Sequence, residues 1–196
     1  MKVLIACEFS GIVRDAFLER GHDAISCDLL PTEREGPHYQ GDVIEYMFKE
    51  RWDLIIAHPP CTFLANSGVR WLYNKDKSLN MERWEHMTMA CGFFKTFLHY
   101  PWQRCKKIAI ENPIQHKHAR EMIGVDYDQI IQPWQFGHGE TKTTCLWLKN
   151  LPQLVPTNIV SGREGRVHSL APSKDRWKER SRTYPGIAQA MAEQWG

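Results

Sequence analysis

A cysteine behind two prolines is the residue of this sequence best placed to do chemistry. Cys61 follows Pro59 and Pro60, which come directly after the mostly apolar run 53–58. Each proline ring fixes φ and removes a backbone donor, so the strand predicted over this run must end there. The thiol would then lie at the carboxyl edge of a sheet, where open α/β sheets bind their substrates. By itself, Cys61 is equally well a small buried apolar residue.

A carboxylate follows a second predicted strand. Residues 107–110 have the pattern of a strand, and Glu111 and Asn112 come directly after them. If this strand is parallel to the one before Cys61, the carboxylate and the thiol meet at one edge. A carboxylate does not lower the pKa of a thiol, which is about 8.5 when unperturbed. We therefore expect Glu111 to be protonated or hydrogen-bonded to an electron-poor ring, such as a pyrimidine, to which the thiolate adds.

Two further carboxylates end consecutive predicted segments. Asp28 follows the run 23–27, and Asp42 stands between Gly41 and Val43. In nucleotide-binding α/β folds such carboxylates accept the ribose hydroxyls and meet the adenine edge, which would suit an adenosine cofactor. The alternative, which the carboxylates alone favour, is a pair of solvated turns. The loop 8–11 has a single glycine, so it indicates neither a pyrophosphate site nor a P-loop.

The elements that must position these residues alternate along the first half of the chain. Short apolar runs at 2–6, 23–27 and 53–57 are separated by helical patterns at 12–20 and 43–50. This alternation predicts an α/β fold with a mostly parallel central sheet and helices on both faces. A long amphipathic helix is expected from Met81 to Tyr100, followed by Pro101.

The last third of the chain is predicted to be less regular. Runs 129–136 and 144–148 should pair as a late antiparallel hairpin. Residues 151–182 are expected to form an irregular basic segment, and residues 186–194 to form the closing helix of one domain spanning 1–196. Within this basic segment, Arg176 and Trp177 are candidates for gripping phosphate and stacking on a base, with a solvated loop as the equal alternative.

Composition excludes several classes of protein. The formal net charge is +2, so any site for a polyanion must be local. The six cysteines form no Cys-x-x-Cys pair, which argues against a zinc ribbon and a secreted disulfide scaffold, and no metal site is expected. His116 and His118 are predicted to be surface residues. No run is long enough for a signal peptide or a membrane span, so we expect a cytoplasmic protein.

The motifs occur in the order found in the cytosine-5 DNA methyltransferases. Over roughly residues 1–150 and the terminal helix, the chain resembles that family, as a compact phage- or bacterial-like member. The resemblance rests on residues 8–11, Asp28, 41–43, 59–61, 111–113 and 135–142. It implies a Rossmann-like fold that uses S-adenosyl-L-methionine to methylate C5 of cytosine. It also implies that Cys61 adds to C6 and that Glu111 contacts N3 and the exocyclic amine.

The same resemblance assigns the remaining candidate site residues. The implied cofactor site comprises Glu8, Phe9, Ser10, Gly11, Asp28, Leu29, Asp42, Val43 and Pro59. In the family, one motif usually carries two arginines. Residues 140–144 stand in its place here and contain a single cation, Lys142, which joins Cys61 and Glu111 as a catalytic candidate. Candidates for contact with substrate or nucleic acid are His58, Pro60, Arg70, Asn112, Arg176 and Trp177. Arg70 lies in the segment 62–77, which is either a loop that closes over substrate or a simple connection.

Several alternatives remain open at this point. The family normally has a recognition region of many tens of residues, whereas only about residues 149–182 are available here. A free nucleotide, an unpaired DNA or RNA strand, or a partner protein that supplies recognition would fit this size. Amino-directed methyltransferases also use a Pro-Pro pair, but they need no thiol where Cys61 stands. A protein that binds cofactor or nucleic acid without turnover is the alternative from another class.

Overall fold

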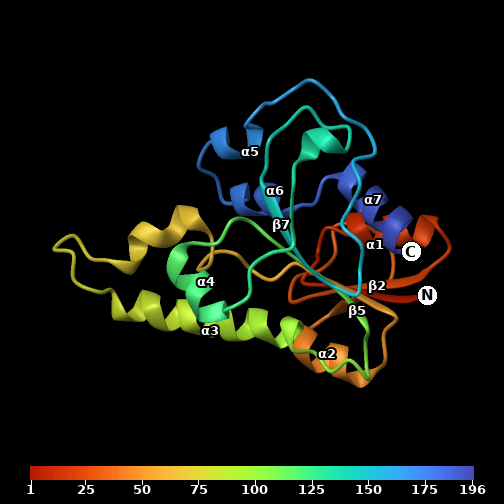
Figure 1. The fold of residues 1–196 in the computed structure, drawn as a ribbon, viewed down its shortest axis with the longest axis horizontal. Helices are drawn as coiled ribbons and strands as arrows, with labels where there is room; N and C mark the ends of the chain where they lie inside the picture. Colours follow the sequence, from red (N-terminus) through yellow and green to blue (C-terminus); the bar gives the residue numbers. More distant parts are fainter.

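The computed structural model describes residues 1–196 and contains one seven-stranded sheet (Figure 1). The strand order across the sheet is β3-β2-β1-β4-β5-β7-β6. The first five strands in the chain are parallel, whereas β7 is antiparallel to both β5 and β6. The strands are β1 (Lys2–Ala6), β2 (Asp23–Asp28), β3 (His38–Gln40), β4 (Leu54–Ala57), β5 (Lys107–Asn112), β6 (Gln129–Ile131) and β7 (Thr144–Lys149).

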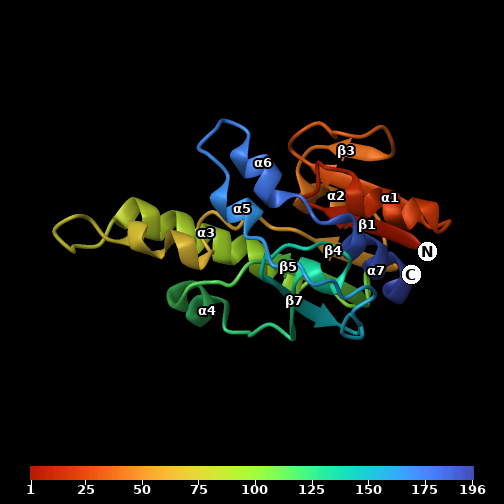
Figure 2. The same ribbon diagram turned by 90° about the horizontal axis from the view of Figure 1, so that it is seen from above.

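Helices cover both faces of this sheet (Figure 2). Helices α1 (Ile12–Glu19) and α7 (Pro185–Trp195) pack together on one face. Helices α2 (Val43–Lys49), α3 (Met81–Leu98) and α4 (Lys117–Ile123) cover the other. The remaining elements are the short helices α5 (Arg166–Ser169) and α6 (Arg176–Ser181) and the 3-10 helices η1 (Asn66–Leu72) and η2 (Pro133–Gln135).

The central strands are apolar because both of their faces are buried. All four residues of β4 are fully buried. Successive side chains of a strand point to opposite faces, so Leu4 and Ile55 join one apolar cluster while Val3 and Leu54 join the other. A parallel sheet with helices on both sides requires this continuous run of apolar residues.

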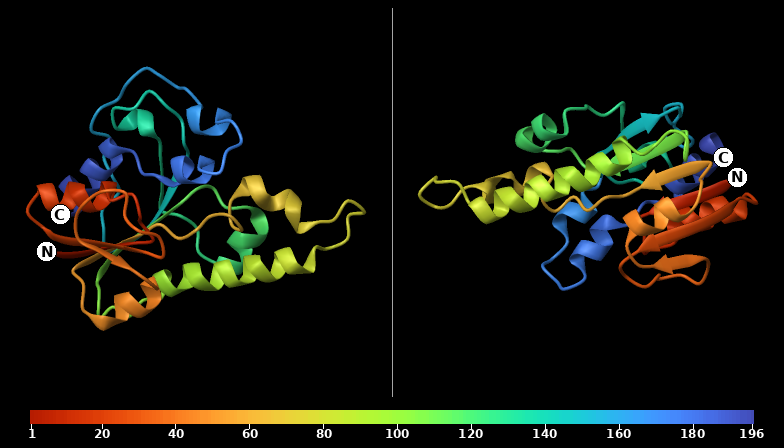
Figure 3. Two further views of the ribbon diagram at one scale, coloured as in Figure 1. Left: turned by 180° about the vertical axis from the view of Figure 1, so that it is seen from behind. Right: turned by 90° about the horizontal axis from the view of Figure 1, so that it is seen from below.

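Helix α3 extends past the sheet and carries η1 along its side (Figures 1 and 3). The Asn80 side chain caps its first turn by accepting a hydrogen bond from the Arg83 backbone N–H at 3.1 Å. Its buried face includes Met87, Cys91 and Phe94, at the helical spacing expected from the sequence. None of the helices combines the length and the apolar character needed to cross a lipid bilayer.

The predicted fold is confirmed, with differences at short or irregular elements. The sheet is mostly parallel, helices lie on both faces, and β6 and β7 form the late antiparallel hairpin. The sequence did not predict β3, an edge strand of only three residues, or η1. The basic segment 151–182 is less irregular than predicted, because α5 and α6 lie within it.

The prediction that His116 is a surface residue is wrong. Its side chain is buried, and its ring accepts a hydrogen bond from the backbone N–H of Ala119 at 3.1 Å. The other ring nitrogen lies 3.0 Å from the carbonyl oxygen of Phe63. His116 therefore caps α4 and ties it to the loop after Cys61, a role that the two-residue spacing of His116 and His118 did not reveal.

Removing the Phe94 side chain should destabilise the whole domain. Phe94 is fully buried in α3, and its ring meets that of Trp147 on β7 edge to face at a centroid separation of 4.9 Å. We expect Phe94→Ala to lower the free energy of unfolding by about 3–5 kcal/mol in urea denaturation. Met89→Ala, on the exposed face of the same helix, should change it by no more than about 0.5 kcal/mol. Equal losses in both variants would contradict this packing.

Candidate functional site

Parallel strands bring the predicted site residues to one edge of the sheet. Ala6 of β1 is in register with Cys27 of β2 and Ala57 of β4, and Ala57 is in register with Ile110 of β5. The residues that follow these positions are those singled out in the sequence. The loops after β1, β2, β4 and β5 therefore emerge side by side.

The turn that carries Cys61 is fixed by hydrogen bonds. The side-chain amide of Asn112 donates to the carbonyl oxygen of Pro59 at 2.8 Å. The backbone N–H groups of Leu64 and Ala65 donate to the carbonyl oxygen of Cys61 at 3.0 and 2.8 Å. Asn112, predicted as a substrate contact, thus braces the loop that presents a partly exposed thiol.

His58 and Glu111 form a hydrogen-bonded pair between the ends of β4 and β5. Nδ1 of His58 lies 3.0 Å from Oε2 of Glu111, and the side chains are 9% and 13% exposed. The backbone N–H of His58 donates to the carbonyl oxygen of Ala6 at 2.9 Å, which extends the β1–β4 pairing by one residue. Nε2 of His58 and Oδ1 of Asn112 are buried without a hydrogen-bond partner in the protein.

The charges around Cys61 set the resting protonation states. Burial, followed by the charge of Glu111, raises the pKa of the Cys61 thiol, while Lys142 and Arg180 oppose this rise. Burial alone would raise the pKa of Glu111, but the hydrogen bond from His58 and the charge of Lys142 outweigh burial and lower that pKa. In the free protein the thiol therefore holds its proton and Glu111 is ionised. In the free protein the hydrogen bond of Glu111 is to His58, so the expected hydrogen bond to a substrate ring stays a prediction.

Lys142 reaches the site from the loop between η2 and β7. Burial lowers the pKa of Lys142, and the charges of Glu111 and Cys61 act in the opposite direction. The ammonium donates to the carbonyl oxygen of Arg182 at 3.0 Å. Lys142 therefore interacts electrostatically with both the thiol and the carboxylate, and its catalytic role stays a prediction.

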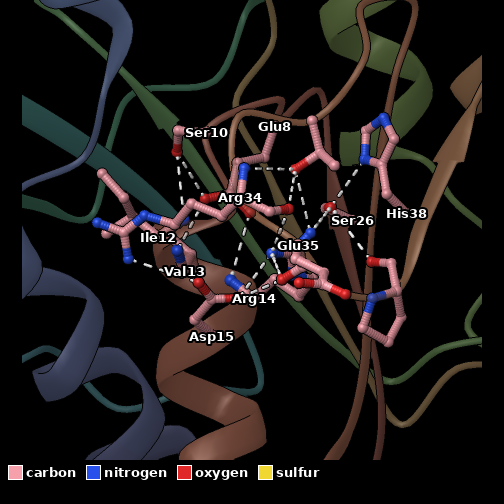
Figure 4. A network of polar contacts seen from close by, with 12 residues as sticks. Glu8, Ser10, Ile12, Val13, Arg14, Asp15, Ser26, Arg34, Glu35 and His38 are labelled. Atoms are coloured by element: carbon pink, nitrogen blue, oxygen red, sulfur yellow. Dashed lines mark hydrogen bonds and ion pairs between the residues drawn. The ribbon is translucent and has the colours of Figure 1, made fainter.

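The loop 8–11 is organised by the carboxylate of Glu8 (Figure 4). This carboxylate accepts hydrogen bonds from the Ser10 hydroxyl at 3.0 Å and from the backbone N–H groups of Val13 at 2.7 Å and Arg14 at 3.3 Å. Negative charge at a helix N-terminus is favourable, so Glu8 stabilises the start of α1. Gly11 has φ 73°, and a Cβ there would lie 2.5 Å from Nη2 of Arg14, so only glycine fits this turn.

Arg14 is a site residue that the sequence reasoning missed. Its side chain is fully buried, and its guanidinium donates to the carbonyl oxygens of Arg34 and Glu35 at 3.2 and 3.1 Å (Figure 4). It also donates to Ser26 Oγ at 3.3 Å and forms an ion pair with Asp15. The bonds to Arg34 and Glu35 join α1 to the loop after β2. A signal was present, because Arg14 interrupts the apolar face of the first helix in the sequence.

The predicted adenosine contacts lie at the ends of β2 and β3. Oδ1 of Asp28 accepts a hydrogen bond from the Leu30 backbone N–H at 2.9 Å, and burial raises the pKa of Asp28. Asp42 caps α2 through a hydrogen bond from the Ile44 backbone N–H at 2.7 Å. Both carboxylates thus have local structural roles. The neighbouring Leu29 side chain is 73% exposed, whereas Val43 is buried.

Helix α6 packs over this part of the site. The rings of Trp177 and Phe9 lie 5.7 Å apart, and Arg182 binds both carboxylate oxygens of Glu33 at 2.7 and 2.8 Å. The basic segment is thus attached to the loops after β1 and β2.

The two arginines predicted to contact substrate or nucleic acid, Arg70 and Arg176, contact other residues of the protein. Arg70 stacks on the exposed Trp71 at 4.4 Å, and Arg176 donates to the His168 carbonyl oxygen at 3.3 Å.

Comparison with known proteins gives likenesses of fold at low sequence identity. No family model matches the chain, and no curated protein matches it. One similar solved structure is a putative DNA modification methyltransferase encoded within a prophage of E. coli, with 16% identity over 87% of this chain and a TM-score of 0.47. Another is the methyltransferase EhMeth of Entamoeba histolytica, with 18% identity over 81% and a TM-score of 0.49. The chain spans only 55% and 57% of these two proteins.

The reactivity of Cys61 should respond oppositely to its two charged neighbours. Below the pKa of a thiol, the alkylation rate follows the thiolate fraction. We expect Lys142→Met to slow carboxamidomethylation of Cys61 at pH 8 and Glu111→Gln to accelerate it, each by roughly three- to tenfold, because the first change removes a charge that lowers the pKa of the thiol and the second removes a charge that raises it. Mass spectrometry of the Cys61 peptide would measure both rates. Lys106→Met, on the exposed connection before β5, is the control and should leave the rate unchanged.

Proposed function

We propose that this chain transfers the methyl group of S-adenosyl-L-methionine to C5 of cytosine in DNA, through a covalent adduct of Cys61 at C6. The observation that carries the proposal is the convergence of three groups at one sheet edge. Cys61, Glu111 and Lys142 contribute a protonated thiol, an ionised carboxylate and an ammonium. The charges of Glu111 and Lys142 shift the pKa of Cys61 and the pKa of each other. A thiol that needs activation and a carboxylate that can handle its proton suit addition to a pyrimidine.

The donor groups at the neighbouring strand ends fit an adenosine cofactor. Asp28 offers a carboxylate, and the exposed Leu29 beside it offers an apolar surface of the kind that lies against a purine. Asp42 and the loop 8–11 lie at the adjacent strand ends. When bound, S-adenosyl-L-methionine supplies an electrophilic methyl group. The chain's own residues would bind the adenosine end and orient the cofactor toward the thiol, beside Pro59.

The protons of the site balance without an external acid. In the resting state the one mobile proton of the Cys61–Glu111 pair resides on sulfur. As the Sγ–C6 bond forms, the C5=C6 electrons move through C4 to N3, and the thiol proton reaches N3 through the Glu111 carboxylate. Lys142 offsets the negative charge during this transfer. Once C5 carries the methyl group, a water molecule takes the C5 proton and the C5=C6 bond re-forms as the Sγ–C6 bond breaks. The N3 proton then returns through Glu111 to the expelled thiolate, which restores the resting thiol.

Access to the ring limits the form of the substrate. A stacked base cannot be attacked at C6, so the cytosine must be flipped out or already unpaired. The segment between β7 and α7 is short and partly held against the site, which favours a substrate that needs little duplex reading. A free or single-stranded cytosine nucleotide or RNA is therefore the alternative substrate. Recognition by a partner protein would also fit.

The proposal is tested by incubating the protein with labelled S-adenosyl-L-methionine and cytosine-containing substrates. Duplex DNA, single-stranded DNA, RNA and free cytidine nucleotides form the four arms, and nucleoside mass spectrometry identifies the product. Formation of 5-methylcytosine supports the proposal, and the most active arm identifies the substrate. If cofactor and oligonucleotide bind but no arm gives a methylated product, the chain is a binding protein on this scaffold.

Replacing the thiol should separate chemistry from cofactor binding. Cys61→Ser removes the nucleophile but none of the residues near β2, so methyl transfer should fall by at least about a thousandfold. The dissociation constant for S-adenosyl-L-methionine, measured by calorimetry, should change less than about threefold. A Cys61→Ser protein that still methylates cytosine at the wild-type rate would falsify covalent catalysis by this residue.

Replacing Asp28 should have the opposite effect. Asp28→Ala removes a carboxylate that would accept hydrogen bonds from the ribose, a loss of about 1.5–3 kcal/mol. Calorimetry should therefore show cofactor affinity falling by roughly ten- to a hundredfold. Asp76→Ala, in the exposed turn before α3, is the matched control and should bind the cofactor as the wild type does. Unchanged affinity in Asp28→Ala would remove this residue from the site.

A further inference from the structure

A cleft of about 610 Å³ lies beside the two loops that carry Cys61 and Glu111. Its lining includes Asn66 from η1 and the residues that follow β5, among them Ile114 and Gln115. This volume is in the range of small-molecule sites. None of the residues proposed for catalysis or cofactor binding lines the cleft.

Gln115 is the unusual member of this lining. Its side chain is 3% exposed, and neither its amide nitrogen nor its carbonyl oxygen has a hydrogen-bond partner in the protein. Leaving a buried polar group unpaired is destabilising, and a glutamine side chain has two such groups. An apolar residue of the same size would avoid this cost. The unpaired carboxamide therefore points to a ligand that completes its hydrogen bonds.

Backbone pairing fixes Gln115 relative to both reactive residues. It forms an isolated antiparallel bridge with Ala65, flanked by a hydrogen bond from the Asn66 N–H to the Ile114 carbonyl oxygen at 2.9 Å. Ala65 is four residues after Cys61, and Gln115 is four residues after Glu111. Four residues of chain span at most about 14 Å. The cleft is thus within reach of a nucleotide next to a target cytosine on the same strand.

The remaining lining suits a neutral planar group. Asn66 is exposed and adds a second carboxamide, and Ile114 is 39% exposed and offers an apolar contact. The four charged side chains of the lining form two ion pairs, so their charges offset each other. Arg120 lies 2.7 Å from Asp126, and Lys117 lies 3.7 Å from Glu121. The two carboxamides can hydrogen-bond to the edge of a nucleobase, and the isoleucine side chain can pack against the face of its ring. This combination suits a nucleobase better than a phosphate.

We propose that Gln115 and Asn66 form a base-reading subsite for a nucleotide that neighbours the target cytosine on a DNA strand. This inference rests on the proposed function. Gln115 acts as a specificity-determining residue, because its carboxamide can donate and accept at the same base edge. A chain with little room for a separate recognition region would thereby read sequence from the loop that also carries Glu111.

The test compares Gln115→Met with wild type on single-stranded oligonucleotides that contain one cytosine between randomised neighbours. Methylation is read by sequencing, and binding is read separately by fluorescence anisotropy of labelled oligonucleotides that differ at one neighbour. The wild type should prefer one base at one neighbouring position by about 5- to 150-fold, as expected for a bidentate contact of 1–3 kcal/mol. Gln115→Met should reduce this preference below about twofold. Gln103→Met, at an exposed position before β5, should retain it.

Stability provides an independent readout of the same substitution. Because Gln115→Met removes two unpaired buried polar atoms, the melting temperature should stay the same or rise. If Gln115→Met does not fold, Asn66→Ala at the exposed side of the cleft replaces it and should weaken the same base preference. A wild type without neighbour preference in binding or methylation, or a variant that keeps it, would overturn the inference. Base-selective binding that Gln115→Met abolishes, without methylation, would support the subsite and refute the proposed reaction.

Discussion

The parallel pairing of β4 with β5 is the constraint on which the site depends. Ala57, the last residue of β4, is in register with Ile110 of β5, so His58 directly after β4 meets Glu111 near the end of β5. The segments that follow these two strands meet again further out, in the isolated antiparallel bridge between Ala65 and Gln115. Two loops that are distant in sequence are thereby joined at both ends, with Cys61 between them. A slip of one residue would turn Glu111 to the other face of the sheet and separate it from the thiol.

A second constraint holds the loops after β1 and β2 together. Glu8 and Arg14 bear opposite charges and are both buried, yet each is satisfied mainly by hydrogen bonds to other groups. Glu8 is held by the N-terminus of α1, and Arg14 by carbonyl oxygens of the loop after β2. A buried charge without such bonds would be strongly destabilising. The network therefore couples the shape of the predicted cofactor loop to correct docking of α1.

The sequence predicted the features that depend on strand order and missed those that depend on three-dimensional contacts. Apolar runs ended by Asp28, by Pro59 and by Glu111 sufficed to predict a parallel sheet with its reactive residues at one edge, because a strand end is a local signal. The roles of Arg14 and His116 could not be predicted in this way. Their partners lie in loops without periodicity, and burial of an arginine or a histidine is decided by those partners. The position of α6 against Phe9 likewise depends on contacts between distant segments.

The electrostatics of the site explain why Glu111 and Lys142 belong together beside Cys61. Glu111 alone would keep the thiol protonated and unreactive, because its charge opposes formation of a thiolate. Lys142 acts in the opposite direction, because its charge lowers the pKa of the thiol and so favours the thiolate, the form that is open to oxidation and alkylation. With both present, and with burial added, the thiol rests in its protonated form next to an ionised acceptor for its proton. In the reaction that we propose, activation requires only that an electron-poor ring displace water and take the proton that the carboxylate relays, so the nucleophile would form where its substrate is bound.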